Sequence, residues 1–288
     1  MPEYRASQTA VMVCQGRAAA HDRLAPDQFA DPTAMALLRD DERALVDLVR
    51  KEQPPAEWSE RVGFEMVARC AEMMVPRTLA IDEAVRERPA TQVVILGAGL
   101  DGRAWRMPEL ADVTVFEVDQ PASQQDKRDR AATLDGKPPV FVPVDFGRDR
   151  LGDALVAAGH RGAEPTTWVW EGVVPYLTRD EVATTVQAIA SLSSPGSRLI
   201  VNYQARSMRS MFGRFVVQAM TKVADRPNPW AAEPWRSTWS PATMSRLLTR
   251  HGFTVRRDDD LHTLAPAGMD TESSTVSFRS SRVAVADI

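Results

Sequence analysis

The sequence has few of the residues that build disulfides, metal sites and membrane spans. Its 288 residues include two cysteines, Cys14 and Cys70, without CxxC spacing, so reduced thiols are expected rather than a disulfide. The four histidines lie far apart, and we therefore predict no metal site. No apolar run is as long as a membrane span, and residues 1–20 lack a signal-peptide core. These absences favour a cytoplasmic protein without a membrane partner.

An excess of positive charge is also missing. The net charge is −4 and the pI is about 5.7, with arginines scattered along the chain. A surface for duplex nucleic acid normally needs a basic face, so we expect no nucleic-acid partner. Hydrophobic residues make up 44% and charged residues 26% of the chain, as in ordinary globular proteins. The length suits one large α/β domain or a core domain with a helical extension.

Residues 91–121 have the pattern of a nucleotide-binding turn. An apolar, β-branched run ends at Leu96 and suits a buried parallel strand. Gly97 and Gly99 follow, and the absence of a Cβ there permits a sharp turn and close approach to a ligand. A second apolar run leads to Asp119, about twenty residues after the glycines, where a carboxylate can accept both ribose hydroxyls. The pattern predicts a nucleoside site at the first strand–helix turn of a doubly wound sheet.

The chain is predicted to contain an N-terminal helical cover over residues 1–90 and a core over residues 91–288. Helices are expected at 8–20, 29–50 and 58–86, with the last interrupted at Pro76. From residue 91 strands and helices alternate, which is typical of a parallel sheet. The expected strands are 92–97, 113–118, 139–144, 166–171 and 197–203, then a closing antiparallel pair at 252–257 and 275–285.

An apolar insert, residues 204–238, interrupts this alternation. Helical core packing would explain its methionines. Because the insert follows the fifth strand, it should lie beside the carboxyl ends of the strands, and we predict a substrate lid there.

Three features decide how to interpret the GxGxxG spelled by Gly97, Gly99 and Gly102, a motif that is weak by itself. The third strand ends at Asp145-Phe146, where a carboxylate and a backbone N–H could bind adenine. The fourth strand leads into residues 171–177, which bring a glutamate and a tyrosine to the ligand edge. No Tyr-x-x-x-Lys pair is present, so short-chain reductase chemistry has no base. These features favour a methyl-donor site over a dinucleotide site.

The sequence resembles the leucine carboxyl methyltransferase family, including bacterial S-adenosylmethionine-dependent enzymes of secondary metabolism. The matching motifs, in family order, are Arg77-Thr78, 92–101, 116–121, 143–145 and 171–177. The resemblance covers about residues 10–205 and implies a Rossmann-like class I methyltransferase fold. One departure is Gly102, where the family usually carries Thr or Ser. A hydroxyl that could cap the next helix is missing there, which leaves Asp101 as the expected cap.

The resemblance also implies S-adenosyl-L-methionine as cofactor. Gly97 and Gly99 would line the methionine portion of this donor, Asp119 would hold the ribose, and Asp145 with the Phe146 backbone would bind adenine. Arg77, with Arg17 as a second partner, would bind the donor carboxylate, and Glu171 would face the amino group or sulfonium. The predicted donor site therefore comprises Arg17, Arg77, Gly97, Ala98, Gly99, Asp101, Asp119, Gln120, Asp145, Phe146 and Glu171.

We predict methyl transfer to an oxygen of a small to medium, partly apolar acceptor, such as a polyketide or a short peptide. A carboxylate acceptor is slightly preferred because it is ionised at neutral pH and needs no base. A hydroxyl acceptor would need one, for which Tyr203 or His262 could serve; the predicted catalytic residues are Glu171, Tyr176 and Tyr203. Two alternatives stay open: an NAD(P)-dependent oxidoreductase and a non-catalytic nucleoside-binding protein. Both a monomer and a homodimer remain compatible with the sequence.

Overall fold

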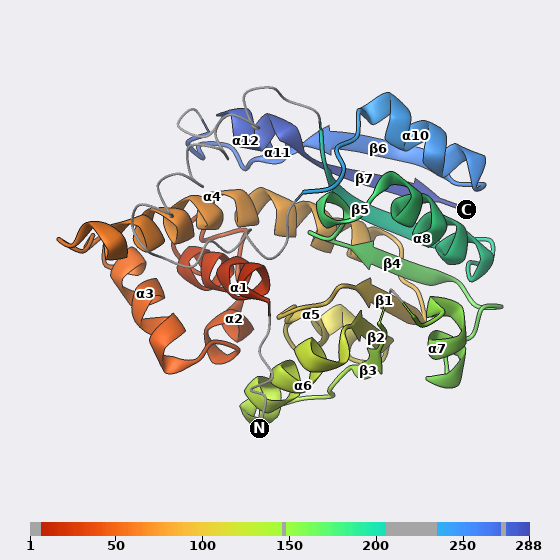
Figure 1. Cartoon of the computed structure of the whole chain (residues 1–288), viewed down its shortest axis with the longest axis horizontal. Coiled ribbons are helices and arrows are strands. Elements are labelled where there is room, and N and C mark those ends of the chain that lie inside the picture. The colour runs from red at the N-terminus through yellow and green to blue at the C-terminus, as the bar shows by residue number, and fades with distance from the viewer. Residues whose placement is uncertain (1–6, 146–147, 206–234, 272–274) are drawn as a thin grey trace.

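The computed structural model describes residues 7–145, 148–205, 235–271 and 275–288. Its centre is a seven-stranded sheet with the order β3-β2-β1-β4-β5-β7-β6 (Figure 1). Strands β1 to β5 are parallel, and β7 lies antiparallel between β5 and β6. The strands are β1 Gln92–Leu96, β2 Thr114–Asp119, β3 Val140–Pro143, β4 Thr166–Trp170, β5 Arg198–Gln204, β6 Thr254–Asp260 and β7 Ser281–Asp287. The predicted doubly wound sheet with a late antiparallel pair is confirmed.

Helices cover both faces of this sheet (Figure 1). The helices are α1 Gln8–Ala20, α2 Pro32–Ala36, α3 Asp40–Arg50, α4 Trp58–Glu87, α5 Arg103–Arg106, α6 Pro121–Arg130, α7 Leu151–Ala157, α8 Arg179–Ser191, α10 Pro241–Arg250, α11 Leu261–Leu264 and α12 Thr275–Ser280. Short 3-10 turns lie at Pro108–Leu110, Ala131–Thr133 and Val174–Tyr176. Several helices begin with a side-chain cap: Asp31, Thr178 and Ser240 each accept a backbone N–H of the helix they precede.

Alternate residues of the strands enter hydrophobic clusters on opposite faces of the sheet. Val94 and Leu96 of β1 pack with residues of α7, α8 and α10. Val93 and Ile95 pack on the other face with residues of α4, α11 and α12. Each such side chain stabilises the fold by about 1.5–3 kcal/mol when fully buried. This two-sided burial explains why β1 is apolar at nearly every position.

A third cluster belongs to the N-terminal helices and includes Phe64, Val67 and Val75 of α4. Helix α4 is long enough to contribute to this cluster with its first half and to the sheet with its second half. Figure 1 shows α1 and α2 beside α5, at the end of the sheet where the glycine turn lies. The N-terminal helices therefore cover the carboxyl ends of the central strands.

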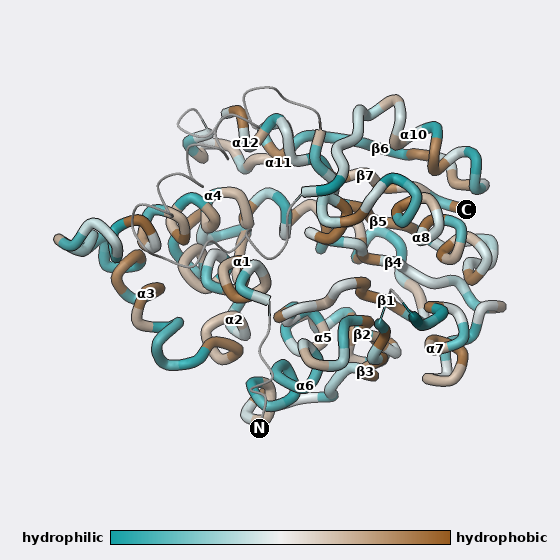
Figure 2. Tube along the Cα trace, viewed as in Figure 1, coloured by the Kyte–Doolittle hydropathy of each residue, from teal (hydrophilic) through white to brown (hydrophobic). Residues whose placement is uncertain are grey.

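Ion pairs join this cover to α6, a helix that is hydrophilic along most of its length (Figure 2). Arg39 Nη2 lies 2.6 Å from Asp126 Oδ1, and Arg130 contacts both Asp126 (2.9 Å) and Glu42 (2.5 Å). The Asp126 side chain is fully buried. A buried carboxylate must be paired, so these contacts fix the cover against the core.

The structure corrects three sequence-based predictions. Pro76 does not interrupt α4, although a proline inside a helix removes one hydrogen bond. Pro76 lies between the two halves of α4 that enter different clusters, and packing on both sides outweighs this loss. The segment 29–50 forms two helices, α2 and α3, instead of one. Residues 275–280 form α12, so the last strand begins at Ser281; buried Phe278 packs with Ile81 of α4.

Candidate active site

The glycine turn after β1 has the backbone geometry that only glycine adopts readily. Gly97 has φ 64° and Gly99 has φ 47°. A Cβ on Gly97 would lie 2.3 Å from Val173 Cγ2, which follows β4. The turn is held against β2 because the backbone N–H of Gly97 donates to the carbonyl of Val118 (2.8 Å) and that of Ala98 to the same oxygen (3.1 Å). The predicted glycines thus form a tight turn between the ends of β2 and β4.

Asp119 lies at the carboxyl end of β2 and faces this turn. Its Oδ2 accepts the backbone N–H of Gly99 (2.7 Å), and its Oδ1 accepts that of Gln120 (2.7 Å). Burial raises the pKa of Asp119, and the two backbone donors partly oppose this shift. The carboxylate is fixed in orientation, and each oxygen keeps lone pairs for further donors. Gln120 is exposed and contributes its backbone N–H.

Arg77 and Glu171 meet where α4 passes the end of β4. Arg77 Nε donates to Glu171 Oε1 at 2.7 Å, and both side chains are at most 10% exposed. Within the described residues, neither terminal nitrogen of Arg77 has a hydrogen-bond partner. Burial would raise the pKa of Glu171, but Arg103 and Arg77 lower it to about 2. The site therefore presents an ionised carboxylate next to a guanidinium with unused donors.

This pair belongs to a larger buried group of alternating charges, joined by contacts of 3.6 Å or less. Its cations are Arg17, Arg77, Arg103 and Arg106, and its anions are Asp31, Asp82, Asp101 and Glu171. Each of these side chains is at most 10% exposed, so the pairing offsets the desolvation of every member.

Arg17, predicted to bind the donor carboxylate, is engaged elsewhere. Its Nε donates to Asp31 Oδ2 (2.9 Å) and its Nη2 to the carbonyl of Leu100 (2.6 Å). Ala10 of the same helix lies 3.0 Å from the point where a Cβ on Gly99 would be. Arg17 thus ties α1 over the glycine turn, and this structural role argues against its use as a ligand.

Asp101 and Thr33 compensate for the glycine at position 102. Asp101 Oδ1 accepts the backbone N–H of Arg103 (2.7 Å) at the start of α5, as expected from the missing hydroxyl. The space beside Gly102 is filled from another segment: a Cβ there would lie 2.0 Å from Thr33 Oγ1. That hydroxyl donates to Asp31 Oδ1 (2.8 Å). A hydroxyl is therefore present at this place, supplied by α2.

Asp145 follows β3 and is partly exposed, with Arg148 at 3.7 Å. Phe146, predicted to bind adenine through its backbone, lies outside the described residues, as do residues 206–234 of the predicted lid. The C-terminal end of that insert reaches the motif after β4, since the N–H groups of Arg236 and Ser237 donate to the carbonyl of Pro175 (2.7 and 3.2 Å).

The structure separates the predicted catalytic residues. Tyr176 is half-buried in the 3-10 turn after β4, close in sequence to Glu171. Tyr203 is fully buried in β5, and its hydroxyl donates to Asp258 Oδ2 (2.7 Å). Burial first, and then the bond to Asp258, raise the pKa of Tyr203 far above its ordinary value. This position argues against Tyr203 as a base. His262 lies in α11, on the face of the sheet that α4 covers.

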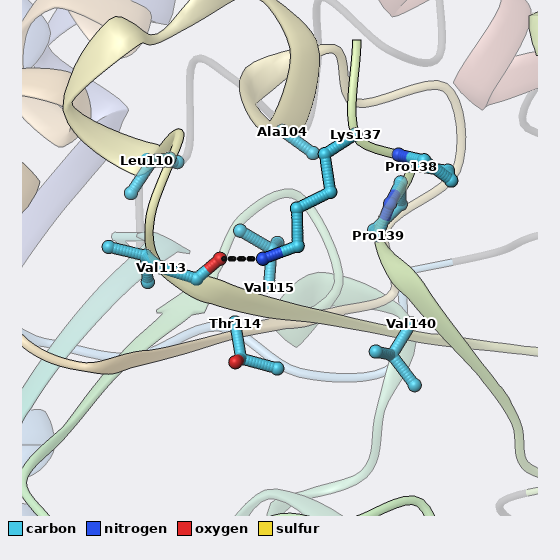
Figure 3. Close-up of a pocket in the computed structure, with 9 residues that line it drawn as sticks. All are labelled: Ala104, Leu110, Val113, Thr114, Val115, Lys137, Pro138, Pro139 and Val140. Atoms are coloured by element: carbon cyan, nitrogen blue, oxygen red, sulfur yellow. Dashed lines mark hydrogen bonds between the residues drawn. The ribbon is translucent and has the colours of Figure 1, made fainter.

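A small pocket lies at the amino ends of β2 and β3, away from the glycine turn (Figure 3). Its lining includes Thr114 and Val140, which begin β2 and β3, and Lys137, whose Nζ donates to the carbonyl of Val113 (3.4 Å). Ligands of open α/β sheets bind outside the carboxyl ends of the strands, so this pocket is not the candidate site.

Sequence reasoning missed Asp82, Arg103 and Arg106 as members of the site. Asp82 lies five residues after Arg77 on α4 and is 3% exposed. A signal was present, because Asp82 stands among apolar residues of an otherwise buried helical segment, and buried charges need partners. Which cations supply them depends on how α4 and α5 pack.

Comparison with known proteins identifies the family of this chain. The profile of the leucine carboxyl methyltransferase family matches residues 10–190. The chain belongs to this family. A protein of Mycobacterium sp. (strain KMS), named "Putative S-adenosyl-L-methionine-dependent methyltransferase", is 37% identical over 204 residues. The match covers 67% of this chain and 65% of that protein, slightly less than two thirds of its length.

A second mycobacterial relative agrees with this family assignment, and a solved structure agrees with the fold. A Mycobacterium tuberculosis (strain H37Ra) protein of the same name is 35% identical over 204 residues, covering 66% of this chain and 64% of that protein. The crystal structure of a DUF574 family protein from Streptomyces avermitilis superposes with a TM-score of 0.55 and 14% identity, covering 99% of this chain and 98% of that chain. At 14% identity the similarity to this solved structure shows the fold alone.

In the described part of the chain, no helix is long and apolar enough to cross a membrane.

Proposed function

We propose that this family member is an S-adenosylmethionine-dependent O-methyltransferase. The observation that carries the proposal is the pairing of Arg77 with Glu171 beside the glycine turn (2.7 Å). The amino-acid end of S-adenosylmethionine is a zwitterion, which needs one cation and one anion at close range. Unused donors on Arg77 suit its carboxylate, and the ionised Glu171 suits its ammonium. Family membership and the names of the mycobacterial relatives support the same donor.

The remaining donor contacts follow from the ends of β1, β2 and β3. Gly97 and Gly99, with positive φ, form the tight turn that brings the Gly99 backbone to Asp119, and Asp119 has lone pairs free for the ribose hydroxyls. Asp145 is partly exposed at the end of the next strand and would accept the adenine amino group. The residues present thus fit the donor.

When bound, the donor supplies a methyl group on a positively charged sulfur. The protein then mainly orients the reactants and keeps water out. Glu171, with a pKa of about 2, remains an anion and is unsuited as a base. Tyr203 is buried and engaged with Asp258. An acceptor carboxylate needs no base, so carboxyl methylation remains preferred over hydroxyl methylation. We propose a small to medium, partly apolar acceptor from secondary metabolism.

Calorimetric titration tests the donor. The protein should bind S-adenosylmethionine and S-adenosylhomocysteine but neither NADH nor NADPH. Asp119→Ala should weaken donor binding at least about tenfold, since it removes an acceptor for two hydroxyls. Asp112→Ala is the matched control, because this exposed aspartate precedes the same strand at its other end. Binding of a nicotinamide cofactor alone would refute the proposal.

A second experiment tests the acceptor. Carboxylic acids and their hydroxyl counterparts of equal size would be compared by release of S-adenosylhomocysteine. Turnover of acids, with Tyr203→Phe as active as wild type, is the expected result. Donor binding without turnover of any member of a broad panel would favour a non-catalytic nucleoside-binding protein.

A further inference from the structure

Arg103 has more carboxylate partners than Arg77, although Arg103 lies deeper in the protein. The Arg103 residue is 2% exposed and contacts three carboxylates. Its Nε donates to Asp82 Oδ1 (2.7 Å), and its Nη1 donates to Glu171 Oε2 (2.8 Å) and to Asp101 Oδ2. The guanidinium therefore joins α4, the glycine turn and the end of β4 behind the candidate site.

Glu171 is consequently held by two arginines of different kinds. Arg77 reaches Oε1 through Nε alone and keeps both terminal nitrogens without a partner in the described chain. Arg103 reaches Oε2 and is itself fixed by Asp82 and Asp101. If Arg77 turns toward an arriving anion, Glu171 loses one anchor and retains the other. Only Arg103 then determines where the carboxylate points.

We infer that Arg103 is a positioning residue, which holds Glu171 in place for the ammonium group of the donor's amino-acid end. The inference rests on the proposed function. Arg103 does not touch the donor, since Glu171 lies between them in this arrangement. Its effect should appear only in ligands that carry the ammonium group.

The number and directions of its contacts explain why this anchor has to be an arginine. Glu171 contacts Arg103 from α5 and Arg77 from α4, and the charges of Asp101 from the glycine turn and Arg17 from α1 also act on it. Asp101 repels Glu171, and Arg103 contacts both carboxylates at once. A lysine would keep the charge but lacks the planar fork that donates to several carboxylates in fixed directions.

A cycle of two variants and two ligands tests the inference. Arg103→Lys and wild type would be titrated with S-adenosylhomocysteine and with an analogue in which hydrogen replaces the α-amino group. Arg103→Lys should weaken S-adenosylhomocysteine binding about tenfold or more, because an ammonium–carboxylate contact is lost. The same variant should change binding of the deaminated analogue by less than about twofold.

Arg106→Lys is the matched control. Arg106 is similarly buried (5% side-chain exposure) and bonds to Asp82 (2.6 Å), yet has no contact with Glu171. It should affect the two ligands equally. Circular dichroism would establish folding, and the lysine variants keep the buried charge where Arg103→Gln would remove it. Equal weakening of both ligands by Arg103→Lys would overturn the inference. Failure of wild type to bind S-adenosylhomocysteine would instead overturn the proposed function.

Discussion

The contact between Gly102 and Thr33 gives a direct prediction about packing. Gly102 has φ −108°, a conformation open to other residues, so space rather than backbone strain excludes a side chain there. A Cβ would lie 2.0 Å from Thr33 Oγ1 and 3.1 Å from Thr33 Cβ. Thr33 cannot easily withdraw, because its hydroxyl is bonded to Asp31 (2.8 Å), which is bonded to Arg17 (2.9 Å).

Gly102→Ser should therefore destabilise the protein. Overpacking of this kind costs about 1–3 kcal/mol. In a chain of this size, each kcal/mol lowers the melting temperature by roughly 2–4 °C. Urea unfolding followed by circular dichroism would measure the change, with Gly162→Ser as the control. Gly162 is exposed, and its nearest contact, the carbonyl of Leu192, lies at an ordinary 3.8 Å.

A substitution of Thr33 tests whether its contact with position 102 causes the loss of stability. Thr33→Ala alone should cost about 1 kcal/mol, since it removes one hydrogen bond to Asp31. Combined with Gly102→Ser, it opens the space that the new side chain needs, so the double variant should be more stable than Gly102→Ser. A coupling of about 0.5–3 kcal/mol is expected. Additive losses, or a Gly102→Ser protein as stable as wild type, would refute the packing argument.

Three further predictions concern ionisable groups. The pKa of Glu171 is lowered from 4.5 to about 2, which corresponds to a stabilising contribution on the order of 3 kcal/mol. This contribution is present above pH 4.5 and is lost as the pH falls toward 2. The free energy of unfolding of wild type should therefore fall across this window, and that of Glu171→Gln should not. Burial raises the pKa of Glu117 to about 7 against the opposing charge of Lys127. The contribution of Glu117 to stability is therefore present below pH 4.5 and is lost as the pH rises through 7. Glu117→Gln should remove this pH dependence of the free energy of unfolding, and an unchanged pH dependence would contradict the shift. Burial raises the pKa values of Cys14 and Cys70 to about 12 and about 11. A thiol reagent at pH 8 should therefore label both cysteines only after unfolding. Rapid labelling of the folded protein would exclude this burial.

Local patterns in the sequence predicted the elements that build the donor end of the sheet. The five parallel strands match their predicted bounds to within one residue, and α1 spans Gln8–Ala20 as expected. Gly97, Gly99 and Asp119 also lie together as predicted. Each of these features depends on side-chain periodicity or on backbone freedom within a short stretch, which the sequence displays directly.

Predictions failed where packing between distant segments decided the outcome. Pro76 continues a helix because α4 is packed along both halves, and Thr275–Ser280 forms a helix although its residues alternate like a strand. Short alternating runs fit more than one structure until their neighbours are in place. The interruption at Pro76 and the early start of the last strand were both wrong for this reason.

The sequence by itself determined the class of the fold, the turn that faces a ligand and the carboxylate at the end of β2. Only the tertiary structure decided that Arg17 fastens the cover, that Thr33 supplies the hydroxyl missing at Gly102, and that Arg103 holds Glu171. The physical reason is that a buried charge must find its counter-charge in space. The ion pairs of this site join residues up to 94 positions apart in the chain, so no local spacing encodes them.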